Sequence, residues 1–148
     1  MAQIWYKTEI DRQSIIDKAH KNTLVETLDI KITEIGDDFI KGTMPVDSRT
    51  KQPAGLLHGG ASMALAETLA STGAYLCVDP EKYRVVGQEI NANHVRSATS
   101  GHVTGIAKLG KRTQVWEIKI YKSEDDFSDK TLCCISRMTA QRIDGGQQ

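Results

Sequence analysis

Alternating apolar and polar side chains predict an antiparallel sheet in this chain. Residues 28–35 and 39–46 alternate in this way on either side of Gly36-Asp37-Asp38, a sequence typical of a hairpin turn. The same alternation returns in four later segments bounded by turn residues: 84–92, 101–108, 112–122 and 131–142. We therefore expect six strands with one face of the sheet against a core.

One long helix is predicted between the second and third strands. Residues 60–76 are rich in helix formers, and small residues lie on several of the helix faces: Ala61, Ala64, Ala66, Ala70, Gly73 and Ala74. Such a helix is expected to be enclosed by other structure. A helix that interrupts antiparallel strands predicts an α+β fold, with the sheet curled round a central helix. Residues 11–21 suggest a further amphipathic helix, and residues 47–55 a loop.

Length and composition predict one domain. The 148 residues, 39% of them hydrophobic, can bury a single core, and residues 1–10 and 144–148 are expected to be loose termini. The 19 basic and 19 acidic residues balance, so no net field favours nucleic acid or an anionic membrane. Three cysteines do not form an even disulfide framework, and no apolar leader or spanning segment is found, which favours a cytoplasmic protein. Of the adjacent Cys133 and Cys134, which look like consecutive strand residues, one is expected to face inward and the other outward.

The junction between the loop and the long helix is the first candidate for chemistry. Gly59 and Gly60 allow close backbone approach, and the first amides of a helix lack intrahelical acceptors. The positive end of the helix would stabilise an oxygen that gains negative charge during acyl transfer, although a plain turn is the alternative. His58 could bind the thioester, carry a proton or only orient the loop. Gln52 could donate to a carbonyl, position water or make local loop contacts.

Glu67 is the second candidate. It lies in the part of the helix expected to be enclosed, where a buried carboxylate needs a partner or a function. Ser71 follows one turn later and could hydrogen-bond the carboxylate. A buried structural pair and an exposed helix glutamate remain the alternatives.

Gly59 and Glu67 are too far apart to act together within one chain. Eight positions along a helix correspond to roughly 12 Å. If both act on one thioester, Gly59 must come from one subunit and Glu67 from another, as in a two-fold dimer.

Basic side chains near two strand ends form a third group. His94 and Arg96 lie on one side of residues 91–98, while Lys108, Lys111 and Arg112 surround the next turn. These cations could hold phosphates or be solvated strand ends. The sequence has no CxxC or HxxxH metal pair and no P-loop, GxGxxG or GxSxG motif.

Residues 55–62 have the sequence GLLHGGAS, and residues 66–67 are Ala-Glu. In these two segments the chain resembles the hotdog thioesterases of the phenylacetate and 4-hydroxybenzoyl-CoA group. Residues 43–53, 89–98 and 114–116 are similar to the 1,4-dihydroxy-2-naphthoyl-CoA thioesterases of menaquinone synthesis, whose near relatives clear misloaded aryl carrier protein. The resemblance covers residues 5–142. It implies a homotetramer of two hotdog dimers that hydrolyses an aromatic or related acyl-CoA, with CoA as part of the substrate and with no separate cofactor.

The resemblance also implies roles for individual residues. The N–H of Gly59 would polarise the thioester carbonyl, with Gln52 and His58 of the same subunit nearby. Glu67 of the opposite subunit would act as nucleophile or general base, held by Ser71. The CoA nucleotide would be bound by a further set: His94, Arg96, Ser97, Lys111 and Arg112.

Two departures leave the acyl group open. Ala54 stands where the family has a bulkier aromatic residue, and the turn at residues 123–130 is longer than usual. The rival hypotheses are a hotdog hydroxyacyl dehydratase and a non-catalytic acyl-CoA binding module, and the thioester could be carried by CoA or by a carrier protein.

Overall fold

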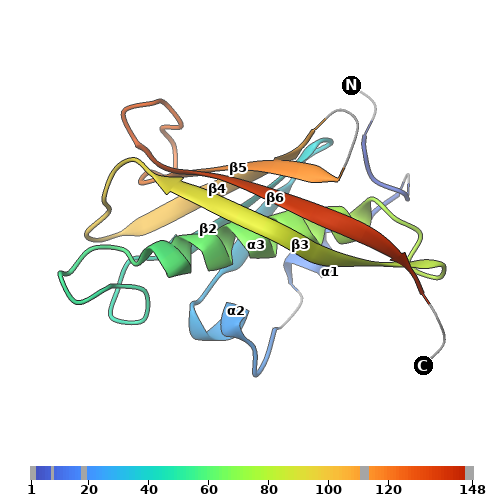
Figure 1. Ribbon diagram of the computed structural model, residues 1–148, viewed down its shortest axis with the longest axis horizontal. Coiled ribbons are helices and arrows are strands. Elements are labelled where there is room, and N and C mark those ends of the chain that lie inside the picture. The colour runs from blue at the N-terminus through green and yellow to red at the C-terminus, as the bar shows by residue number, and fades with distance from the viewer. Residues whose placement is uncertain (1–2, 8, 18–19, 111–113, 146–148) are drawn as a thin grey trace.

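The computed structural model describes residues 3–7, 9–17, 20–110 and 114–145 (Figure 1). Its elements follow in chain order: α1 (Arg12–Ile16), α2 (Leu24–Thr27), β1 (Lys31–Ile35), β2 (Phe39–Pro45), α3 (Gly59–Leu76), β3 (Tyr83–His94), β4 (His102–Leu109), β5 (Val115–Tyr121) and β6 (Leu132–Asp144). The expected strands and the long helix are all present, with bounds that differ by a few residues.

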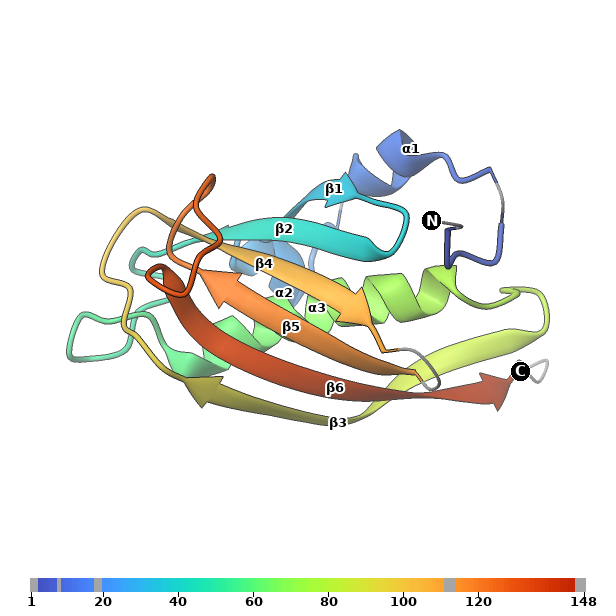
Figure 2. The ribbon, with the colours of Figure 1, turned by 90° about the horizontal axis from the view of Figure 1, so that it is seen from above.

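The six strands form one antiparallel sheet in the order β1-β2-β4-β5-β6-β3. The sheet curls over α3, which runs along its concave face (Figure 2). The predicted α+β arrangement is therefore confirmed. Because β3 ends the strand order, its outer edge has no partner strand in the described part of the chain.

Close contact between α3 and the sheet depends on glycine. Gly42 of β2 and Gly105 of β4 face each other across the ladder. A Cβ on either would come within 2.7 Å of the fully buried Leu69 side chain. Likewise, a Cβ on Gly73 would lie 2.4 Å from the buried Trp116 ring. These glycines let α3 lie close to the sheet, and the tight packing of Leu69 and Trp116 at these points fixes the position of α3 along the sheet.

The helix expected over residues 11–21 is wrong in extent. α1 ends at Ile16 with Asp17 as its C-cap, and His20 and Lys21 belong to no helix. Asn22, just beyond the expected range, adopts a left-handed backbone with φ of 60°, which a right-handed helix cannot continue through. A separate helix, α2, follows, with the Thr23 side chain as its N-cap. The sequence pattern did not predict α2, because four residues are too few to show a helical period.

Both chain ends are held more closely than expected over the residues that the structure describes. Trp5 is buried, and its Nε1 donates to the carbonyl oxygen of Gly36 at 2.8 Å. Asp144 pairs with Tyr83 at the end of β6. None of the helices in the described ranges is long and apolar enough to cross a membrane.

Candidate active site

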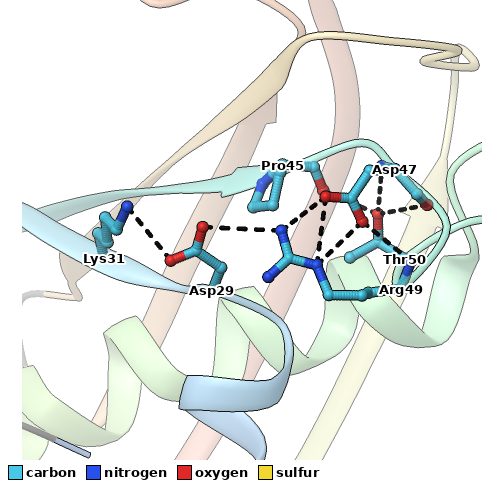
Figure 3. A network of polar contacts seen from close by, with 6 residues as sticks. All are labelled: Asp29, Lys31, Pro45, Asp47, Arg49 and Thr50. Carbon is cyan, nitrogen blue, oxygen red and sulfur yellow. Dashed lines mark hydrogen bonds and ion pairs between the residues drawn. The ribbon is translucent and has the colours of Figure 1, made fainter.

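A hydrogen-bonded loop fixes the approach to α3 (Figure 3). The buried Thr50 hydroxyl donates to the carbonyl oxygen of Pro45 at 2.7 Å and accepts from the N–H of Asp47 at 3.0 Å. Arg49 pairs with Asp47 at 2.6 Å and with Asp29 at 3.7 Å. The hydrogen bond from the Arg49 side chain is the main reason that the pKa of Asp47 lies below its ordinary value. The loop is thereby tied to the segment that leads into β1.

The same loop positions Gln52. The N–H of His58 donates to the carbonyl oxygen of Thr50 at 2.8 Å, and the N–H of Gln52 donates to that of Leu56 at 2.8 Å. The Oε1 of Gln52 accepts from the N–H of Ala54. Since this bond uses the side-chain oxygen, the amide NH₂ group of Gln52 remains the end available to donate to another molecule.

His58 is the N-cap of α3. Its Nδ1 accepts from the N–H of Gly60 at 2.8 Å, and its carbonyl oxygen accepts from those of Ala61 and Ser62 at 3.0 and 3.2 Å. The structure thus supports the interpretation that His58 orients the loop. The N–H of Gly59 has no acceptor among the described residues. It is therefore the helical amide left free for a ligand.

A cavity of about 420 Å³ lies at this end of the helix. Five residues expected at the site line it together: Gln52, Gly59, His94, Arg96 and Ser97. The Arg96 guanidinium donates from Nη1 to the carbonyl oxygen of Leu132 at 3.1 Å, which holds it at the cavity. Lys111 and Arg112 lie outside the described residues. Lys108 instead packs its ammonium 5.9 Å from the centre of the Phe39 ring.

Glu67 borders a different hollow, of about 680 Å³, together with Ser71. No residue lines both this hollow and the Gly59 cavity. The expectation that Glu67 is enclosed is wrong for the single chain, because it lies on the face of α3 opposite Leu65 and Leu69 and is exposed. Its carboxylate has no hydrogen bond or ion pair within the described ranges. The Ser71 hydroxyl donates to Met138 Sδ at 3.8 Å, and not to Glu67 as expected.

The Glu67 carboxylate lies beside the outer strand of the sheet. Its Oε1 is 3.3 Å from where a Cβ of Gly87 would be, at the irregularity in the β3 ladder between Gly87 and Glu89. Gly87 belongs to the strand whose outer edge is unpaired. The unpartnered carboxylate and the free sheet edge are therefore neighbours.

Sequence reasoning missed the apolar continuation of the Glu67 hollow. A second hollow of about 320 Å³ shares His20, Ser71 and Thr72 with it. Its remaining lining is mostly apolar: Ile15, Ile32, Tyr75 and Leu76. These residues come from α1, β1 and the end of α3, so no local sequence motif could have joined them.

The cysteines do not provide a nucleophile. Cys133 and Cys134 are 4% and 1% exposed, so the expectation that they face opposite environments is wrong. Cys133 lines the Gly59 cavity, and its Sγ donates to the carbonyl oxygen of Ile120 at 3.1 Å. Burial raises the pKa of each thiol to about 11. No group of His, Cys, Asp or Glu in the described ranges could hold a metal ion.

An antiparallel sheet curled round a helix that begins at Gly59 is the hotdog fold. The profile of the thioesterase superfamily matches residues 54–127, and the chain belongs to this family. It is 54% identical over 122 residues to the 1,4-dihydroxy-2-naphthoyl-CoA hydrolase of Escherichia coli strain K12, a match that covers 80% of this chain and 85% of that protein. It is 49% identical over 120 residues to the proofreading thioesterase EntH of Cronobacter turicensis, covering 79% and 83%.

Solved structures agree with this assignment. A thioesterase from Haemophilus influenzae superimposes with a TM-score of 0.83 at 42% identity and covers 99% of both chains. A mutant thioesterase from Pseudomonas aeruginosa gives a TM-score of 0.82 at 41% identity, covering 96% of this chain and 99% of that one. The chain is thus a thioester hydrolase of the hotdog fold.

Proposed function

We propose that the protein hydrolyses an aromatic or related acyl-CoA to the free acid and CoA at a site shared by two subunits. The observation that carries this proposal is the separation of two unpartnered groups on one helix. The N–H of Gly59 borders one cavity, and the Glu67 carboxylate borders another. The Gly59 cavity has no carboxylate in its described lining, and the lining of the Glu67 hollow does not include Gly59, so each contains one of the two groups that the reaction needs.

The free edge of β3 supports the pairing of two copies. This strand has twelve residues, and Val86 on it is 45% exposed. An exposed edge strand presents unpaired backbone groups that a second copy can satisfy. Antiparallel pairing along β3 through a two-fold axis would extend the sheet and lay the two α3 helices antiparallel. The Glu67 of one copy, already beside β3, would then approach the Gly59 of the other. The tetramer implied by the resemblance remains a prediction.

The lining of the two hollows favours a substrate with an anionic carrier and an apolar acyl group. Arg96 lines the Gly59 cavity, where its guanidinium can meet phosphates. The Glu67 hollow is bordered by Leu24, Val25 and Met63, and it continues into the apolar hollow beside Tyr75. The thioester carbonyl would lie where the Gly59 cavity of one subunit meets the Glu67 hollow of the other.

At this junction the chemistry follows from the groups present. The N–H of Gly59 donates to the carbonyl oxygen and stabilises the negative charge that develops there. Glu67 either attacks the carbonyl carbon, forming an anhydride that water then hydrolyses, or removes a proton from a water molecule that attacks. In both routes the bond to sulfur breaks and the thiolate leaves as CoA. The acid product contains one oxygen derived from water or, in direct attack, from the carboxylate.

Replacement of Glu67 tests this function. Glu67→Gln should lower kcat for benzoyl-CoA by about 10²–10⁴-fold, measured as release of free thiol. Glu117→Gln, at an exposed glutamate of β5, is the matched control and should keep full activity. Unchanged turnover in Glu67→Gln would contradict the proposal. An enoyl thioester formed without free thiol would indicate the dehydratase, and tight binding without turnover by the wild type would indicate a binding module.

The thioester carrier is the second question. The relative from Escherichia coli is named as a hydrolase of a CoA thioester, and the relative from Cronobacter turicensis is named as a proofreading thioesterase. We propose CoA as the carrier, because the Arg96 guanidinium at the Gly59 cavity suits a nucleotide phosphate. A panel of aryl-CoA, medium-chain acyl-CoA and aryl carrier protein should show the highest kcat/KM for aryl-CoA. A higher value for the carrier protein would reverse this assignment.

A further inference from the structure

His94 and Gly59 meet at the beginning of α3. His94 is the last residue of β3 and lies opposite Cys134 of β6. A Cβ built on Gly59 would be 2.7 Å from His94 Nε2, 3.1 Å from Cε1 and 3.3 Å from Cδ2. The imidazole therefore directs its Nε2 edge at Gly59, and the lack of a side chain at Gly59 makes room for it.

Both residues bring unpartnered nitrogen groups to the same cavity. The N–H of Gly59 has no acceptor in the described part of the chain. The two ring nitrogens of His94 make no hydrogen bond or ion pair to any described residue. His58 differs, because its Nδ1 is occupied by the N–H of Gly60. His94 is thus the histidine whose nitrogens are both available at the Gly59 cavity.

We propose that His94 is a catalytic residue that binds the thioester oxygen together with the N–H of Gly59. The proposal rests on the function proposed above. With a proton on Nε2, the imidazole donates a second hydrogen bond to the oxygen as negative charge develops on it. The nucleophile adds to the carbonyl carbon, the carbon–sulfur bond breaks, and its electron pair leaves with the thiolate. His94 keeps its proton throughout, so the step balances without a further reactant.

The alternative role for His94 is to bind CoA phosphates, as the sequence suggested. The contact with Gly59 argues against this role, because the phosphates are separated from the reacting carbonyl by the whole pantetheine arm. The three heavy atoms nearest to a Cβ built on Gly59 all belong to His94, and none to Arg96 or Ser97. His94 is therefore assigned to the thioester carbonyl, whereas Arg96 and Ser97 remain the residues expected to bind the CoA nucleotide.

Two thioesters distinguish these roles: benzoyl-CoA and S-benzoyl-N-acetylcysteamine, which lacks the nucleotide and every phosphate. His94→Ala should lower kcat by about 10²-fold for both, as expected for loss of one donor to a developing oxyanion. The KM for benzoyl-CoA should change little, because the lost interaction is made in the transition state. His94→Gln retains a side-chain N–H and should recover part of the lost kcat.

The controls separate a local effect from a folding effect. His102→Ala removes another exposed histidine, which faces Glu124 at 3.6 Å and lines neither cavity. It should leave both reactions unchanged. Since His94 is also exposed, His94→Ala should keep the melting temperature of the wild type.

The proposal is overturned if His94→Ala raises the KM for benzoyl-CoA and leaves the truncated thioester unaffected. Unaltered kcat for both substrates would overturn it as well. Failure of the broader function has a different signature, since Glu67→Gln would then remain active toward both thioesters.

Discussion

Gly59 and Glu67 belong to one helix, yet they border separate hollows of the same chain. This separation predicts that two inactive variants can restore each other. Gln52→Ala damages the Gly59 end, and Glu67→Ala removes the carboxylate. In a mixed dimer, one of the two sites receives an intact Gln52 and an intact Glu67. After statistical exchange of subunits, about a quarter of the wild-type activity should return.

The matched control mixes Glu67→Ala with Glu67→Gln, which share the same defect and should stay inactive. Native mass spectrometry would establish that mixed dimers have formed. A mixture of Gln52→Ala and Glu67→Ala that exchanges subunits without recovering thiol release would show that each chain holds a complete site.

The fold could be predicted because its signals are local. Alternation in the β5 segment and small residues along α3 each identify an element without reference to distant parts of the chain. The α1 helix was overextended because Ile15 and Ile16 supply a helical pattern, while nothing in that pattern marks the C-cap at Asp17. Element type was thus more predictable than element length.

The site was less predictable because its geometry depends on tertiary packing. Glycine and a following helix correctly indicated a free amide at Gly59. Apolar neighbours of Glu67 wrongly indicated burial, because a 3.6-residue period places them on other faces of the helix. The contact between His94 and Gly59 joins a strand end to a helix start, and no sequence spacing reports such an approach.

Thr50 should control both stability and activity. Its buried hydroxyl links Pro45 to Asp47, and its carbonyl oxygen accepts from the N–H of His58. Thr50→Val keeps the shape of the side chain but removes the hydroxyl that bonds to the N–H of Asp47 and to the carbonyl oxygen of Pro45. The free energy of unfolding should fall by about 1–3 kcal/mol in urea titrations, and kcat should fall because the loop that carries Gln52 shifts.

The control for this change is Thr33→Val in β1. The Thr33 hydroxyl is exposed and donates to the carbonyl oxygen of Lys41 at a longer 3.4 Å. This variant should lose well under 1 kcal/mol and no activity. Equal effects of the two substitutions would show that the buried position of Thr50 contributes nothing specific.

Asp47 should contribute to stability in a defined pH range. Its folded-state pKa lies below the ordinary 3.8, mainly through the hydrogen bond from Arg49. A lowered folded pKa gives stability that is present above pH 3.8 and is lost as the pH falls through the folded value. The melting temperature of Asp47→Asn should therefore lie below that of the wild type at neutral pH, and the difference should shrink as acid is added.

Asp129→Asn is a suitable control for the acid titration. Asp129 is exposed and makes no ion pair among the described residues. The melting temperature of Asp129→Asn should equal that of the wild type at every pH. A gap between Asp47→Asn and the wild type that widens in acid would contradict the stabilising role of the Arg49 contact.

Cys133 should be chemically silent although it lines the Gly59 cavity. Burial raises its pKa to about 11, so less than about one thiol in a thousand is ionised near pH 7.5, and the thiolate is the form that reacts. Iodoacetamide at that pH should leave thioester hydrolysis intact for hours, whereas the same reagent should label the unfolded chain rapidly. If it inactivates the native enzyme quickly and Cys133→Ser prevents this, the cavity thiol is reactive, and a nucleophile other than Glu67 must be considered.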